Sequence, residues 1–195
     1  MDATALLRPG LLDGLVVALG GGGDVFGPPL AALGAHPAVL PATLDEDAMV
    51  AAVDPATRVL VHDLRPAFAR APAPVEDPLR ATLDLAWVTV RAVANAAFIS
   101  GSGAGPASGS GKITLIAPAP DDDHSAVAGV RAAAENLART LSIEWARHGI
   151  TTVAITPASD TTAAELAALA AYLASPAGDY FSGCRLALGE AAVAA

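Results

Sequence analysis

The sequence predicts an α/β fold: a Rossmann-like, doubly wound parallel sheet in a three-layer αβα arrangement, formed by one domain that spans residues 1–195. Short apolar runs alternate with longer segments of helical spacing, and this alternation is typical of a mostly parallel sheet covered on both faces. The length of 195 residues fits one domain, and the 53% of hydrophobic residues provides a sizeable core.

Six apolar runs are predicted to be strands. They cover 15–19, 38–40, 58–62, 113–116, 152–155 and 185–188. The run 58–62 is almost continuously apolar, as expected for a strand that is buried on both faces. Four glycines, 20–23, follow the first run and predict a tight turn.

Helical spacing is clearest in two long segments, 77–98 and 125–148. Shorter helices are expected at 28–33, 45–53 and 165–174. The glycine- and serine-rich stretch 101–111 predicts a flexible loop. After Pro157 only a short segment precedes the last helix, and the family resemblance given below implies that the region covering a substrate is shortened there.

Composition excludes several classes of function. The net charge is −9 and no cluster of Lys or Arg occurs, so binding to nucleic acid is not expected. The apolar run 11–19 contains Asp13 and is too short to cross a membrane, so no membrane contact is expected. Cys184 is the only cysteine and cannot form an intrachain disulfide. A cytoplasmic protein is therefore expected.

Three segments of the second half carry a family resemblance. The run 132–150, AAAENLARTLSIEWARHGI, resembles the long interface helix of the short-chain dehydrogenase/reductase family, in its ketoacyl-reductase-like form. The run 151–157, TTVAITP, resembles the strand that leads to that family's Pro-Gly motif. The segments LASP (173–176) and GCRLALG (183–189) resemble its closing helix and strand. The resemblance implies a Rossmann-like fold and NAD(P)-dependent oxidoreductase ancestry.

The catalytic positions implied by the resemblance are occupied by other residues. The family has a Tyr-x-x-x-Lys pair at the start of the long helix, and the matching positions here are His124 and Ala128. The active-site serine belongs at the end of strand 113–116, where Ala117 begins the run Ala-Pro-Ala-Pro. Thr82 stands where the family has a helix asparagine, and the run 62–65, HDLR, replaces its Asn-Asn-Ala-Gly motif. The resemblance therefore implies a degenerate member in which no catalytic residue is expected.

The dinucleotide-binding turn is also altered. Aligning the family's Thr-Gly-x-x-x-Gly-x-Gly pattern from Leu19 places Asp24 and Phe26 at its later glycines. A carboxylate there would repel a pyrophosphate by about 4 kcal/mol at 4 Å and a dielectric near 20. Gly20, Gly21 and Gly22 remain weak candidates for phosphate binding. This chain is expected to bind no cofactor of its own, and NAD(P) is expected on a partner subunit.

These observations lead to the hypothesis of a pseudoenzyme that pairs with an active short-chain dehydrogenase/reductase, or with itself, through segments 77–98 and 125–148 and the last strand. Candidate interface residues are Trp87, Val130, Leu137, Leu141, Trp145 and Leu186. Tryptophan is enriched at the energetic centres of interfaces. The hetero-oligomer would stabilise the active subunit or shape its substrate pocket.

Two alternatives stay open. A divergent oxidoreductase would use the glycine turn for NAD(P) and His124 as its acid/base, although a residue at a helix start more simply begins the helix. A ligand-binding module without chemistry is the other. The three carboxylates at 121–123 are expected to interact favourably with the dipole of the following helix and not to bind a metal ion. No metal site is therefore expected. Cys184 is expected to pack in its strand.

Overall fold

The computed structural model describes residues 7–70, 77–100, 110–121 and 124–189. Six parallel strands form one sheet in the order β2-β1-β3-β4-β5-β6. Their bounds are β1 Val16–Gly20, β2 His36–Val39, β3 Val59–Asp63, β4 Gly111–Ile116, β5 Ile150–Pro157 and β6 Arg185–Leu188. The predicted α/β class, the parallel sheet and the single domain are confirmed.

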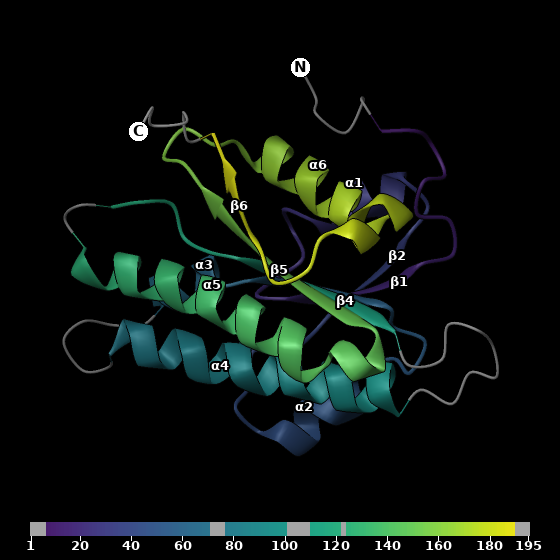
Figure 1. Ribbon diagram of the computed structural model, residues 1–195, viewed down its shortest axis with the longest axis horizontal. Coiled ribbons are helices and arrows are strands. Elements are labelled where there is room, and N and C mark those ends of the chain that lie inside the picture. Colours follow the sequence, from purple (N-terminus) through teal and green to yellow (C-terminus); the bar gives the residue numbers. More distant parts are fainter. Residues whose placement is uncertain (1–6, 71–76, 101–109, 122–123, 190–195) are drawn as a thin grey trace.

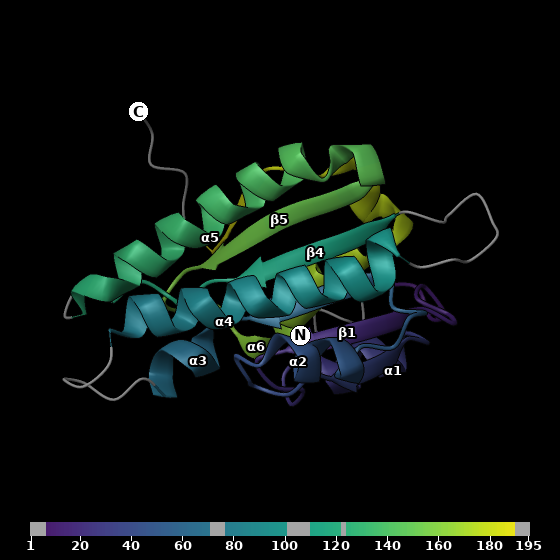
Figure 2. The ribbon, with the colours of Figure 1, turned by 90° about the horizontal axis from the view of Figure 1, so that it is seen from below.

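Helices cover both faces of the sheet (Figure 1). Their bounds are α1 Gly27–Ala32, α2 Glu46–Ala52, α3 Arg65–Arg70, α4 Pro78–Val93, α5 Ser125–Glu144 and α6 Ala163–Ala174. α4 continues into π-helical turns at Ala94–Ile99, and α5 is followed by a 3₁₀ turn at Ala146–His148. A second 3₁₀ turn, Pro176–Tyr180, follows α6. Figure 2 shows α4 and α5 side by side along the sheet.

Alternation along the strands divides the core into two layers, because successive side chains point to opposite faces. Val17 of β1 and Val59 of β3 face α1 and α6 on one side. Ala18 and Leu60, one residue further along each strand, face α2, α4 and the end of α5 on the other side. Alanines fill a third cluster between α4, α5 and the sheet, where small side chains allow close helix packing.

β2 is an edge strand, since no strand lies beyond it in the described parts of the chain. His36 donates its N–H to Leu15 and Leu40 donates to Leu19, so alternate residues bond toward β1. Pro37 falls between them, toward the open edge. Proline has no N–H to offer to an added strand, and its presence on an edge protects against unwanted pairing.

Two predictions about loops and lengths can be compared with the structure. Most of the expected flexible loop 101–111 lies outside the described residues, and Gly111 already belongs to β4. Five residues, 158–162, separate β5 from α6. The segment Pro78–Ile99 is long and apolar enough to cross a membrane by length and composition, but 56% of its apolar 18-residue stretch is buried inside the protein.

Candidate functional site at the carboxyl ends of the strands

The chain reverses its direction across the sheet between β1 and β3. β1 pairs with β2 on one side and with β3 on the other. In doubly wound folds, ligands bind in the crevice outside the carboxyl ends of the strands at this switch point. The segments that form the crevice here are Gly20–Gly23 at the end of β1 and 62–65 at the end of β3. These residues are therefore the first place to look for a cofactor site.

The first two glycines of the turn are required by contacts within the chain. A Cβ atom on Gly20 would lie 2.0 Å from Nδ1 of His62, and one on Gly21 would lie 2.0 Å from the backbone oxygen of Asp63. Gly21 also has a φ of 87°, which favours glycine. Gly22 is exposed, and a Cβ there would meet nothing within 4 Å. The φ of 120° at Gly22 also favours glycine, so all three weak cofactor candidates have a structural reason to be glycine.

The start of α1 offers no free backbone donor to a phosphate. Gly27 donates its N–H to the carbonyl of Gly23 at 2.7 Å, and Leu30 donates to Phe26. Pro28 and Pro29 lie between them and have no N–H. A helix N-terminus binds pyrophosphate through its unpaired N–H groups. That device is absent from α1. The Pro-Pro pair was the signal in the sequence, and it was used there only to place the helix start.

The structure corrects the expected alignment of the turn. α1 begins at Gly27, so the glycine at the helix start is Gly27 and not the position of Phe26. Phe26 is 1% exposed and packs into the core with α1 and α6, so its bulk does not face a phosphate site. Asp24 lies exposed in the turn. The turn is one residue longer than the family pattern aligned from Leu19.

The charged groups at the end of β3 bind each other. Arg65 donates from Nε and Nη2 to the two carboxylate oxygens of Asp63, at 2.8 Å each. The backbone N–H of Arg65 donates to the same carboxylate at 3.1 Å. The guanidinium carbon lies 5.9 Å from the centre of the Phe26 ring. Where the resemblance implies a small Asn-Asn-Ala-Gly loop, this chain has a closed ion pair.

His62 is buried beside this pair in its neutral form. Its side chain is 1% exposed, and neither ring nitrogen has a hydrogen-bond partner in the described structure. Burial lowers its pKa from 6.5 to about 4, and the Asp63 carboxylate opposes this change more weakly. A neutral, enclosed imidazole is poorly placed to exchange protons with a substrate.

The three degenerate catalytic positions do not form a cluster of reactive groups. Ala117 is fully buried after β4. His124 is the residue before the first turn of α5, and its ring lies 4.8 Å from that of Phe68. Ala128 is exposed on α5. His124 therefore packs against an aromatic ring at the helix start, as the simpler reading expects.

Arg131 was not among the predicted site residues, yet it joins the carboxyl ends of two strands. Its Nη1 donates to the carbonyl of Pro118 at 2.7 Å and to that of Pro157 at 2.8 Å. Shifting the Tyr-x-x-x-Lys pattern by three residues places its pair on Val127 and Arg131, which keeps a cation at the second position. Val127 is 3% exposed and has no hydroxyl, so neither alignment supplies a phenol. The cation on the helix was the signal that would have indicated the second alignment.

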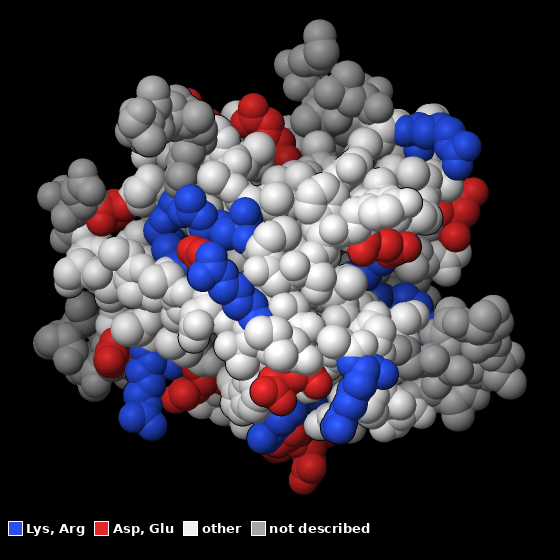
Figure 3. All heavy atoms as spheres, in the orientation of Figure 1, with Lys and Arg blue, Asp and Glu red and all other residues white. Residues whose placement is uncertain are grey.

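A cavity of about 310 Å³ lies beside Arg131, between α5, the end of β5 and the start of β6. Thr156 lines it, and its buried hydroxyl has no partner in the described structure. Glu135 binds Arg139 at 2.7 Å and approaches Arg185 at 3.9 Å. Figure 3 shows basic side chains around an acidic one on the face that carries α5 and β6. The charges at this cavity are largely paired within the chain.

Other candidate groups have ordinary structural surroundings. Asp121 is exposed, and the other two carboxylates of 121–123 lie outside the described residues. No group of three metal-ligating side chains occurs in the described ranges. Burial raises the pKa of the Cys184 thiol, which disfavours the reactive thiolate.

The predicted interface residues divide into three groups by their exposure. Val130 is 0% and Leu141 3% exposed, so both belong to the chain's own core, and their assignment to an interface is corrected. Their stripe of α5 faces the sheet, because helical spacing brings the apolar residues to the inner face. Trp87 is 42% exposed on α4. The remaining candidates, Leu137, Trp145 and Leu186, are partly buried.

Comparison with known proteins identifies the fold. No protein-family model matches the chain, and no curated protein matches its sequence. A citronellol catabolism dehydrogenase of Pseudomonas aeruginosa PAO1 superposes with a TM-score of 0.71 at 20% identity, over 94% of this chain and 96% of that one. A 3-oxoacyl-[acyl-carrier protein] reductase of Brucella melitensis gives 0.70 at 15% identity, over 96% of both chains.

A short-chain dehydrogenase/reductase of Serratia marcescens also superposes, with a TM-score of 0.66 at 20% identity, over 91% of this chain and 96% of that one. The three solved structures agree with this chain in fold along nearly their whole length. The chain therefore has the fold of the short-chain dehydrogenases/reductases. Identities at this level establish the fold and leave the chemistry to be argued from the residues.

Proposed function

We propose that this chain is a non-catalytic subunit with the short-chain dehydrogenase/reductase fold, which pairs with an active enzyme of the same fold. The observation that carries the loss of cofactor binding is the start of α1. Gly27 is already bonded to Gly23, and Pro28 and Pro29 have no N–H. A pyrophosphate brought there would lose the helix amides that normally hold it.

Three further features support the loss of chemistry. The Asp63–Arg65 ion pair closes the end of β3. Arg131 binds strand carbonyls in place of a ligand. Neither alignment of the family's catalytic pair, 124/128 or 127/131, contains a tyrosine. The crevice is thus stabilised by the chain's own side chains and does not need a cofactor to be ordered.

The outer face of α4 and α5 supports pairing with another chain. Trp87 and Ile143 are 42% and 75% exposed. α5 also presents the small, exposed side chains of Ala128 and Ala132, which allow close approach of another helix. Arg91 lies 5.7 Å from the centre of the Trp87 ring and also binds Glu46, so the tryptophan is held in place on the surface.

The test begins with gentle purification of the tagged chain from its own host and mass spectrometry of what elutes with it. A stoichiometric dehydrogenase that retains its Tyr and Lys is expected. The Ala132→Glu substitution should abolish co-elution, because it adds a charge to the proposed helix contact. Tyr180→Ser is the matched control, since Tyr180 is 90% exposed and lies on the 3₁₀ turn after α6.

Cofactor binding by the isolated chain distinguishes the non-catalytic subunit from a divergent oxidoreductase. NADH and NADPH are expected to leave its melting temperature unchanged, whereas a divergent oxidoreductase would be stabilised by them. A chain that elutes alone as a strict monomer would overturn the pairing. Saturable NAD(P) binding would overturn the loss of the cofactor site.

A further inference from the structure

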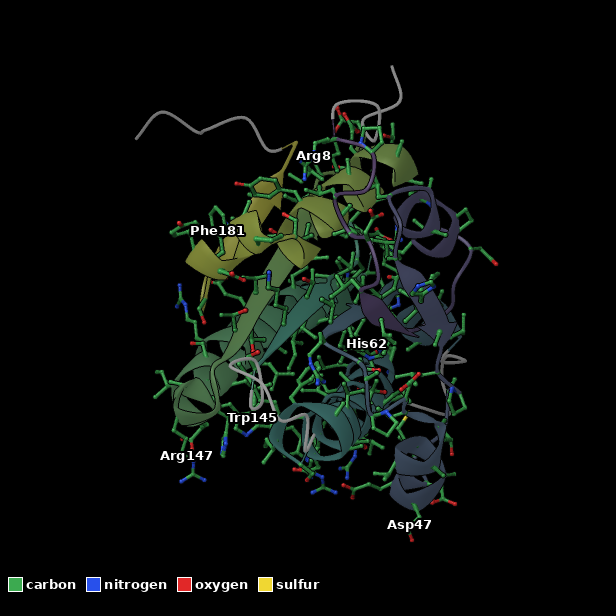
Figure 4. The ribbon with its side chains drawn as sticks, turned by 90° about the vertical axis from the view of Figure 1, so that its right-hand side faces the viewer. Arg8, Asp47, His62, Trp145, Arg147 and Phe181 are labelled. Carbon is green, nitrogen blue, oxygen red and sulfur yellow. The ribbon has the colours of Figure 1, made fainter. Side chains whose placement is uncertain are left out.

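A larger cavity lies at the opposite end of the sheet from the candidate site. Its volume is about 480 Å³, within the range of small-molecule sites. It opens where β3, β4 and β5 begin, between the segment 11–15 before β1 and the corner that follows α6. Figure 4 views the molecule from this end, with Phe181 and Trp145 on opposite sides of the sheet.

Most of the cavity wall is apolar. The apolar side chains that line it are Leu11, Leu12, Leu15, Val59, Ala174 and Pro176. Four charged residues, Asp13, Arg58, Lys112 and Asp179, also line it. Because an apolar wall with a few polar groups binds and orients small molecules, the charges decide which ligand would fit.

Lys112 is already engaged by the chain. Its ammonium lies 2.6 Å from the carboxylate of Asp179. It also donates to the carbonyls of Ala174 and Ser175, the last residues of α6 and its cap. These three acceptors use its three N–H groups. Lys112 and Asp179 therefore leave little net charge for a ligand.

Arg58 keeps one edge of its guanidinium available. Its Nη1 donates to the carbonyls of Thr57 at 2.8 Å and Pro55 at 3.3 Å. No protein acceptor for Nε or Nη2 and no ion pair of Arg58 is found in the described parts of the chain. The Asp13 carboxylate is turned toward Gly34, where a Cβ would lie 2.0 Å from its Oδ1. Arg58 is therefore the charged group of the cavity that has hydrogen-bond donors left for a ligand.

We infer that this cavity binds a small molecule with an apolar body and one anionic group, which accepts hydrogen bonds from Nε and Nη2 of Arg58. A guanidinium fork matches the two oxygens of a carboxylate or the oxygens of a phosphate. The site is remote from the switch point and does not depend on the pairing proposed above, so it is tested on the isolated chain.

The test uses two probes with the same apolar body and opposite charge, 4-phenylbutyrate and 4-phenylbutylamine, in an NMR titration of the amide signals. The acid is expected to produce saturable shifts at Val59, Lys112 and Thr151, and the amine none. Arg58→Gln should weaken binding of the acid about 10- to 100-fold, the range for a hydrogen bond to a charged group. Arg147→Gln should leave it unchanged, because Arg147 points away from the protein at the same end (Figure 4).

A second variant guards against misfolding of Arg58→Gln. Leu11→Trp fills the cavity and retains the arginine, and it is expected to abolish the shifts. Equal binding of acid and amine, an absence of saturation, or undiminished binding by either variant would overturn the inference.

Discussion

Arg65 binds both carboxylate oxygens of Asp63, two residues earlier in the chain, at 2.8 Å each. The pair lies at the switch point of the sheet, where doubly wound proteins bind their ligands. Asp63 is 5% exposed, and the side chain of Arg65 is 29% exposed. The ion pair satisfies a carboxylate that the end of β3 would otherwise bury alone, so it links the closure of the crevice to the stability of the fold.

Removing one partner should destabilise the protein more than removing a surface pair. Arg65→Ala leaves the buried Asp63 carboxylate without its partner, and we expect the free energy of unfolding to fall by about 2 to 3 kcal/mol, with the value reduced for the exposure of Arg65. Urea unfolding measures it. The control is Arg80→Ala, which breaks an exposed pair with Asp84 and should cost less than about 0.5 kcal/mol. Equal losses in both variants would contradict this account.

His62 predicts a loss of stability in acid. Its folded pKa of about 4 lies below 6.5, so between these values the unfolded chain binds more protons than the folded chain. Stability contributed by the neutral imidazole is complete above pH 6.5 and is lost as the pH falls toward 4, by about 3 kcal/mol in total. His62→Leu should remove this part of the pH dependence in urea unfolding at pH 7.5 and 4.5. His148→Gln is the control. If the free energy of unfolding of His62→Leu falls between pH 7.5 and 4.5 as much as that of the unsubstituted protein, the assignment is wrong.

The sequence predicted the fold well because periodicity and apolar runs report burial directly. All six strands were found, with small shifts in their bounds, and the long helices were placed within a few residues. α3 was missed, because six residues with a proline near the start show little periodicity. The segment 77–98 was read as one helix, and the change to π-helical turns after Val93 leaves no mark in the spacing.

The site was predicted less well, because it depends on register and on contacts between distant segments. The family pattern was aligned from Leu19, and only the observed helix start at Gly27 showed that the turn is longer. The contacts of Arg131 with Pro118 and Pro157 join segments 13 and 26 residues away, which no local pattern contains. Val130 and Leu141 were predicted to be interface residues because an apolar stripe on a helix does not indicate whether the chain's own sheet or another chain covers it.

The glycine turn allows a matched test of why its glycines are needed. Gly21→Ala meets the oxygen of Asp63 at 2.0 Å with a φ of 87°, so we expect a loss of more than about 2 kcal/mol. Gly22→Ala has a φ of 120° and no neighbour within 4 Å, so only backbone strain opposes it, about 1 kcal/mol. Thermal unfolding ranks the two variants. A larger loss at Gly22 would mean that the contact with β3 does not fix the turn.

The contribution of Arg131 to the free energy of unfolding is predicted to depend on the geometry of its hydrogen-bond donors. Arg131→Met keeps the length of the side chain but leaves the carbonyls of Pro118 and Pro157 without this donor, and we expect a loss of about 2 kcal/mol in urea unfolding. Arg131→Lys retains a cation with three donors and should recover about half of that loss. Arg139→Met is the control, because Arg139 is 63% exposed and binds Glu135 on the surface. If Lys recovers nothing while Met and the control behave alike, the guanidinium does not hold the ends of β4 and β5 together. Recovery by Lys would instead show that a cation bound to the strand ends stabilises the fold.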